Sequence, residues 1–113
     1  NQNDPAVMNL ALNNAQNITS FYKSTNQPVT IEVVAYGPGL HMLRSDTSPI
    51  KARLASFTME QPDIRFSACE NTQANMSKAE GKDVPLMSEA KVVPSGVVRL
   101  IELQQAGYAY VKP

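Results

Sequence analysis

Apolar and polar residues recur along the 113-residue chain with two different periods, which predict alternating helices and strands. From residue 5 to residue 22, apolar side chains return every three or four positions, as is typical of a helix with one buried face. Asp4 is expected to cap this helix, and Pro5 suits its first position. The apolar stripe consists of Met8, Ala11, Leu12, Ala15, Ile18 and Tyr22.

Four segments rich in apolar or β-branched residues are predicted as strands. Val29–Tyr36 is almost continuously apolar, which favours a strand buried on both faces of a parallel sheet. Ile64–Cys69 and Ala90–Val93 are expected to be the next two strands. Tyr108–Lys112 is expected to be the last one, because large and small residues alternate along it.

Cap residues predict further helices between these strands. Ser48 and Pro49 are expected to cap and begin a helix whose inward-facing residues are Ile50, Leu54 and Phe57. A short helical stretch is expected after Cys69, with Asn71 or Thr72 as its cap. Ser95 is expected to cap the last helix. The predicted inner face of that helix consists of Val97, Leu100, Ile101 and Gln104.

This order of elements predicts a single α/β domain over residues 1–113, a three-layer sandwich with a mostly parallel sheet flanked by helices. A fold of this kind usually opens with a strand, whereas this chain opens with a helix. We therefore expect a first strand upstream of Asn1. Neither a repeat nor a linker divides the chain.

Composition narrows the classes of function. Ten Lys and Arg residues balance ten Asp and Glu residues, so the formal net charge is zero. This argues against a basic surface for nucleic acid or for anionic membranes. No apolar run is long enough to span a bilayer. Cys69 is the only cysteine, which excludes an intrachain disulfide and the usual zinc sites, and no motif implies a metal or a cofactor.

Cys69 is the first candidate for chemistry, because it ends a predicted strand where open α/β sheets place their ligands. A thiol beside a helix N-terminus meets backbone N–H groups that stabilise the thiolate, although the neighbouring Glu70 opposes this effect. The alternative is an inert, buried cysteine, which is common for this residue type. The position alone leaves both interpretations open.

Residues 37–41 form the second candidate region. Gly37, Pro38 and Gly39 permit close approach of a ligand or a small anion nest, or they simply make a turn between a strand and a helix. His41 is the only imidazole of the chain and is a candidate proton donor to Cys69, unless it is a loop residue without a role. Ser95 lies outside any nucleophile motif and is assigned to capping.

Several motifs together resemble the DsrE/DsrF-like family, the sulfur-relay proteins related to YchN. They cover nearly the whole chain in order, as LALNNAQN, VAYGPG, FSACENT, VPSGVV and QQAGYAYVKP. The resemblance implies a small α/β domain that assembles as a homotrimer or a homohexamer. In sulfur-relay members a cysteine carries sulfur as a persulfide and passes it to a partner protein.

The resemblance also implies site residues. Cys69 matches the cysteine of the family's A-C-x-N-T pattern and would carry the persulfide, with His41 as proton donor. Residues expected to line the same cleft are Gly37, Pro38, Gly39, Glu70, Asn71 and Thr72. Without a second cysteine, release of the sulfur requires an external thiol or a partner protein. The implied partner is a sulfur donor or acceptor protein. The alternative is a non-catalytic oligomeric binding module, or a regulator with a redox-sensing cysteine, and the compartment stays open between cytoplasm and periplasm.

Overall fold

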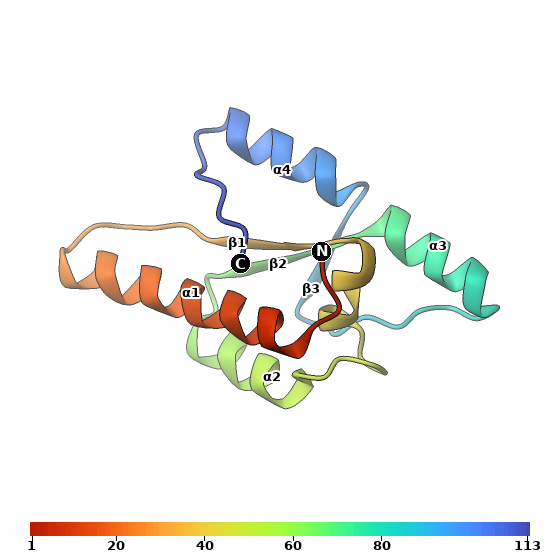
Figure 1. Cartoon of the computed structure of the whole chain (residues 1–113). Coiled ribbons are helices and arrows are strands. Elements are labelled where there is room, and N and C mark those ends of the chain that lie inside the picture. Colours follow the sequence, from red (N-terminus) through yellow and green to blue (C-terminus); the bar gives the residue numbers. More distant parts are fainter.

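The computed structural model describes residues 1–113 as four α-helices, one 3₁₀-helix and three strands (Figure 1). Along the chain the elements are α1 (Pro5–Ser24), β1 (Glu32–Ala35), η1 (Gly37–Leu43), α2 (Lys51–Glu60), β2 (Arg65–Cys69), α3 (Glu70–Glu80), β3 (Ala90–Val93) and α4 (Gly96–Gln105). None of the helices combines the length and the apolar character needed to cross a membrane.

The three strands form one parallel sheet in the order β1-β2-β3, which confirms the predicted α/β class. Ala35 lies opposite Ala68 in the first pair of strands, and Cys69 lies opposite Val93 in the second. All three strands therefore end at the same edge of the sheet. The central strand β2 is buried from Phe66 onward.

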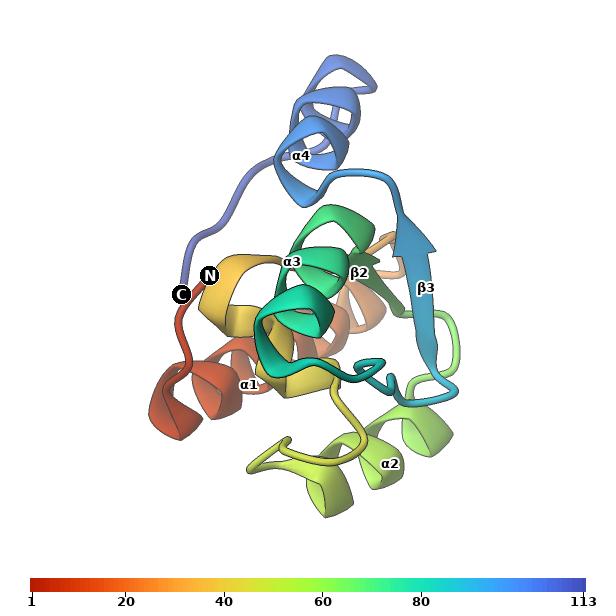
Figure 2. The same ribbon diagram turned by 90° about the vertical axis from the view of Figure 1, so that its right-hand side faces the viewer.

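Helices cover the two faces of the sheet unequally. α1 and α2 lie against one face, α4 lies over the other, and α3 extends from the edge where the strands end (Figures 1 and 2). The main core fills the space between the sheet and the first two helices, because apolar stripes of both helices face Phe66 and Ala68 of β2. Its fully buried helical members include Leu12 and Leu54.

The cap residues confirm one predicted helix start and correct another. Oδ1 of Asp4 accepts the Ala6 N–H at 2.9 Å, and α1 begins at Pro5 as expected. α2 begins at Lys51, two residues later than Pro49, and its N-cap is Ile50. The Ser48 hydroxyl still accepts the Ile50 N–H at 3.4 Å, so Ser48 stabilises the preceding turn instead of the helix itself.

The predicted inner face of α4 is wrong for Val97, Ile101 and Gln104, which are exposed, whereas Leu100 is half-buried. Val97 and Ile101 are each 50% exposed, whereas Gly96 and Leu103 are buried. The helix is rotated because Arg99 turns toward the sheet and forms a bidentate ion pair with Glu32 of β1, with N–O distances of 2.7 and 2.8 Å. A charged side chain thus lies on the side of α4 that faces the sheet.

The predicted strand Tyr108–Lys112 is also wrong. This segment forms no ladder with the sheet, and Tyr108 N–H donates instead to the Leu103 carbonyl at the end of α4. An alternating pattern produces a strand only where a neighbouring strand offers backbone partners. β1 is correspondingly an edge strand and is only half-buried over most of its length, not buried on both faces. The strand expected upstream of Asn1 stays a prediction.

Candidate functional site

The three strand ends bring residues from distant parts of the sequence to one edge of the sheet. Gly37 follows β1, Cys69 is the last residue of β2, and Gly96 opens α4 shortly after β3. The parallel register aligns these ends, and the Asn71 N–H donates to the Pro94 carbonyl at 3.3 Å across them. This edge is where open α/β sheets bind ligands.

Cys69 is itself the N-cap of α3, in place of the predicted Asn71 or Thr72. Its Sγ accepts the Thr72 N–H at 3.4 Å, the contact that a serine or aspartate oxygen usually makes at a helix start. The helix follows the strand without a loop, so the cysteine ends one element and begins the next. The residue is only 4% exposed.

Opposing effects act on the pKa of the Cys69 thiol. Burial raises this pKa, but the Thr72 side chain and the backbone N–H groups of Gly96, Thr72 and Asn71 lower it, and together they prevail. The pKa is therefore below its ordinary value. Glu70, which is exposed in the first turn of α3, is not among the groups that shift it. The site therefore favours a thiolate, the form in which cysteine is a nucleophile.

The glycine turn after β1 serves the site through one hydrogen bond. Gly37 adopts the left-handed region with φ of +55°, and its N–H donates to Oγ1 of Thr72 at 2.9 Å. The Gly39 N–H donates to the Tyr36 carbonyl at 3.2 Å. Both amides thus have acceptors within the chain, so the turn is a connection to α3 and does not form the anion nest considered from the sequence. Pro38 lies in the first turn of η1.

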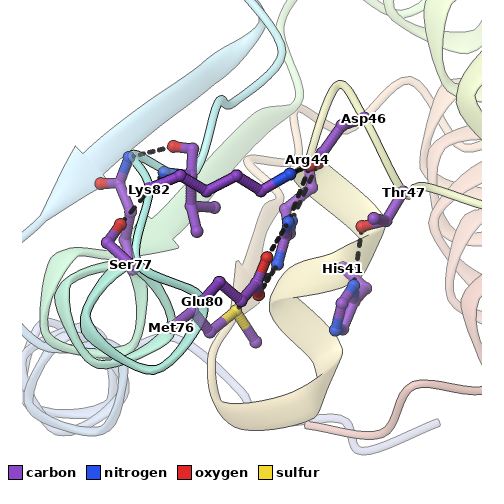
Figure 3. Close-up of polar contacts among 10 residues, drawn as sticks. His41, Arg44, Asp46, Thr47, Met76, Ser77, Glu80 and Lys82 are labelled. Atoms are coloured by element: carbon purple, nitrogen blue, oxygen red, sulfur yellow. Dashed lines mark hydrogen bonds and ion pairs between the residues drawn. The ribbon is translucent and has the colours of Figure 1, made fainter.

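His41 lies in η1, shortly after the turn that follows β1. Its hydrogen-bond partner is Thr47 and not Cys69. Its Nδ1 is 2.7 Å from Oγ1 of Thr47 (Figure 3). No hydrogen bond joins His41 to Cys69, whose Sγ accepts the Thr72 N–H. The proton-donor role predicted for His41 has no support in these contacts. No group of three His, Cys, Asp or Glu side chains is arranged to hold a metal ion.

The Gly96 backbone N–H can lower the pKa of Cys69 because the chain at Gly96 passes very close to the end of β1. A Cβ atom at this position would lie 2.8 Å from Cβ of Tyr36. Only glycine therefore allows the first turn of α4 to approach the end of β1 so closely, and Ser95 caps the helix at that point by accepting the Val98 N–H at 3.4 Å. The capping role predicted for Ser95 is confirmed.

A buried arginine that the sequence analysis did not single out attaches η1 to α3. Arg44 is 1% exposed, and its guanidinium makes two hydrogen bonds to Asp46, at 2.9 and 2.8 Å, and two to Glu80, at 2.6 and 2.9 Å (Figure 3). Lys82 lies 3.8 Å from the Asp46 carboxylate. Glu80 is the last residue of α3, so the cluster holds the far end of the helix that Cys69 begins.

A second ion-pair network lies between the sheet and α4. The Glu32 side chain is 4% exposed and accepts hydrogen bonds from Arg99 and, at 2.7 Å, from the Ser67 hydroxyl. Ser67 and Cys69 are two positions apart on β2 and therefore face the same side of the sheet. The network fixes α4 over the face on which the thiol lies.

A groove of about 780 Å³ lies elsewhere in the molecule, and Cys69 is not among the residues that line it. It runs between α1, β1, α4 and the C-terminal segment, and most of its lining is apolar. Gly39 is the only residue of the predicted cleft that lines it. The groove and the thiol are therefore separate features of the molecule.

Comparison with known proteins agrees with this architecture. The family model described as the DsrE/DsrF-like family matches residues 3–113. The chain belongs to the DsrE/DsrF-like family. A solved structure titled as a protein of unknown function, MTH1491 from Methanobacterium thermoautotrophicum, is 33% identical, with a TM-score of 0.81. The match covers 99% of this chain and 92% of that one. Among curated proteins there is no match.

Proposed function

We propose that this DsrE/DsrF-like protein carries sulfur as a persulfide on Cys69 and passes it to the thiol of a partner. The observation that supports this most directly is the cysteine itself, which caps α3 at the strand-end edge with its pKa lowered by surrounding hydrogen-bond donors. Membership of a family that includes sulfur-relay proteins gives the chemistry its direction, while fold membership alone does not assign an activity.

The transfer consists of two exchanges at sulfur. The Cys69 thiolate attacks a sulfane sulfur of the donor; a bond forms to Sγ, the donor's sulfur–sulfur bond breaks, and its electron pair leaves with the rest of the donor. An external thiolate then attacks the outer sulfur, and the electron pair of the broken bond returns to Sγ. No net oxidation occurs, and the amides of Gly96, Thr72 and Asn71 stabilise the thiolate at the start and at the end.

Mass spectrometry after incubation with polysulfide or thiosulfate tests the proposal. We expect an adduct of about 32 Da, one sulfur atom, on the wild-type protein, removable by a reducing thiol. Cys69→Ser is the test variant. Ser77→Ala is the control, because Ser77 lies toward the C-terminal end of α3 and its hydroxyl contacts the Val84 N–H, not the thiol. The proposal is wrong if Cys69→Ser carries the same adduct or if the wild type carries none.

The 4% exposure of Cys69 favours a second candidate, a non-catalytic oligomeric binding module with an inert cysteine. Alkylation of the native protein by iodoacetamide at neutral pH separates the two. A reactive thiol supports the carrier, whereas a thiol that reacts only after unfolding supports the binding module. A sulfenic acid formed with peroxide in the absence of any persulfide would indicate a redox regulator.

We also propose that the protein assembles with copies of itself, as a homotrimer or a homohexamer. Val97, Val98 and Ile101 expose about half of their surface on one side of α4, and Val92 of β3 is exposed nearby in the sequence. Tyr110 and Val111 are also exposed. Light scattering at micromolar concentration should show an oligomer, and Ile101→Glu should weaken it; a wild-type monomer would contradict the proposal.

A further inference from the structure

Thr72 lies in the first turn of α3, and its two polar groups face two different strand ends. Its backbone N–H donates to Sγ of Cys69 at 3.4 Å, while its Oγ1 accepts the Gly37 N–H at 2.9 Å. Gly37 and Thr72 are 35 positions apart, so the second contact joins the turn after β1 to the cysteine that ends β2. The Thr72 side chain is therefore oriented by the turn after β1, while the backbone N–H of the same residue contacts the sulfur that ends β2.

The direction of the Gly37 hydrogen bond determines what the hydroxyl can do. An amide N–H only donates, so Oγ1 accepts in this pair and keeps its own hydrogen free. No hydrogen bond of the structure uses that hydrogen, so it is available to an acceptor close to the first turn of α3. Among the groups that lower the pKa of Cys69, the Thr72 side chain has the largest effect. A hydroxyl that donates to sulfur stabilises the thiolate more than the thiol.

We propose that the Thr72 hydroxyl is a positioning group for the sulfur chemistry of Cys69, oriented by the Gly37 amide so that its hydrogen is donated to Sγ. This role rests on the persulfide function proposed above. When an acceptor thiolate takes the outer sulfur, the electron pair of the broken bond returns to Sγ, and the hydroxyl stabilises this leaving thiolate. Leaving groups of lower pKa depart faster, so the contact assists discharge as well as loading. Gly37 acts through Thr72 and does not touch the sulfur.

The test compares Thr72→Val, which keeps the branched shape but removes the hydroxyl, with Thr72→Ser, which restores it. The pKa of Cys69 is measured from the pH dependence of alkylation by iodoacetamide, without any sulfur donor. Loss of a hydrogen bond to a charged group should raise this pKa by about one unit in Thr72→Val. Thr72→Ser should retain the wild-type profile. Discharge of the loaded persulfide to dithiothreitol should be slower in Thr72→Val and nearly normal in Thr72→Ser.

Thr58→Val is the matched control, because the Thr58 hydroxyl donates to the Ala55 carbonyl within α2, on the other side of the sheet from Cys69. It should leave the alkylation profile unchanged. If Thr72→Val does not fold, Thr72→Ala is measured with the same expectation. Identical profiles for wild type and Thr72→Val overturn the proposal, and so does a Thr72→Ser profile that follows the valine variant.

Failure of this proposal is distinguishable from failure of the proposed function. Alkylation reports the thiolate alone and needs no sulfur donor. If the thiol pKa rises in Thr72→Val but not in Thr72→Ser, and no persulfide forms on the wild type, the positioning role is supported and the carrier function is contradicted. A persulfide on Cys69 with unchanged profiles in all Thr72 variants supports the carrier function and overturns the positioning role.

Discussion

Gly96→Ala is a perturbation whose size follows directly from the structure. The added Cβ would lie 2.8 Å from Cβ and 3.2 Å from Cδ1 of Tyr36. Carbon atoms in ordinary contact are about 3.5–4.0 Å apart, so the segments around Gly96 and Tyr36 must separate by about 0.7–1.2 Å. Cβ of Tyr36 is fixed to the backbone and no rotamer change can move it away. The first turn of α4 must therefore shift from the end of β1.

This shift should affect stability and the thiol together. Overpacking of this kind costs about 1–3 kcal/mol of the free energy of unfolding, which corresponds to a melting temperature lower by roughly 4–12 °C for a domain of this size. The Gly96 amide moves away from Sγ of Cys69, and the loss of one hydrogen bond should raise the pKa of the thiol by about 0.5–1. Thermal melts followed by circular dichroism and the pH profile of alkylation measure the two effects.

Gly81→Ala provides the matched control. Gly81 ends α3 with φ of +69°, and nothing lies within 4 Å of a Cβ built there. The substitution should cost about 1 kcal/mol through backbone strain alone and leave the pKa of Cys69 unchanged. The reasoning would be refuted by a Gly96→Ala protein with wild-type melting temperature and thiol pKa, or by an equal change of thiol pKa in Gly81→Ala.

Two further predictions concern stability. Leu12 is fully buried in α1, whereas Leu10 is 44% exposed, so Leu12→Ala should lower the free energy of unfolding by about 2–5 kcal/mol and Leu10→Ala by less than about 0.5, as measured by urea titration. The hydrogen bonds from Arg44 hold the pKa of Asp46 at about 2, below its ordinary 3.8. The ionised carboxylate therefore stabilises the fold fully at a pH above its ordinary pKa, and this stabilisation is lost as the pH falls toward 2. The melting temperature should drop over that pH range, and it should drop less steeply in Asp46→Asn. Equal slopes of melting temperature against pH in the two proteins would contradict this prediction.

The sequence was sufficient where the signal is local. Asp4 before Pro5 and Ser95 before Gly96 cap their helices through hydrogen bonds spanning two or three residues, and such caps can be predicted without knowing the fold. The three strands that form the sheet were also predicted in type and order. Tyr108–Lys112 failed because a strand depends on a neighbour that its own residues do not specify.

Charged residues caused the misjudged face of α4. A pattern of apolar positions assumes that the helix turns its most hydrophobic side inward, and the 67-residue separation of Glu32 and Arg99 hides the ion pair that turns it otherwise. The same holds for Arg44 and Glu80, which are 36 positions apart. A buried arginine carries no sequence signal of its own until the fold places two carboxylates around it.

The cysteine site combines both kinds of information. That Cys69 ends a strand and precedes a helix is a local signal, and it correctly placed the thiol beside backbone N–H groups. Which groups orient the sulfur depends on contacts from Gly37 and Gly96, which precede and follow it by about thirty residues. The lowered pKa favours reaction of the thiol, whereas its 4% exposure leaves a sulfur donor little surface to attack, so the alkylation experiments measure the balance between the two.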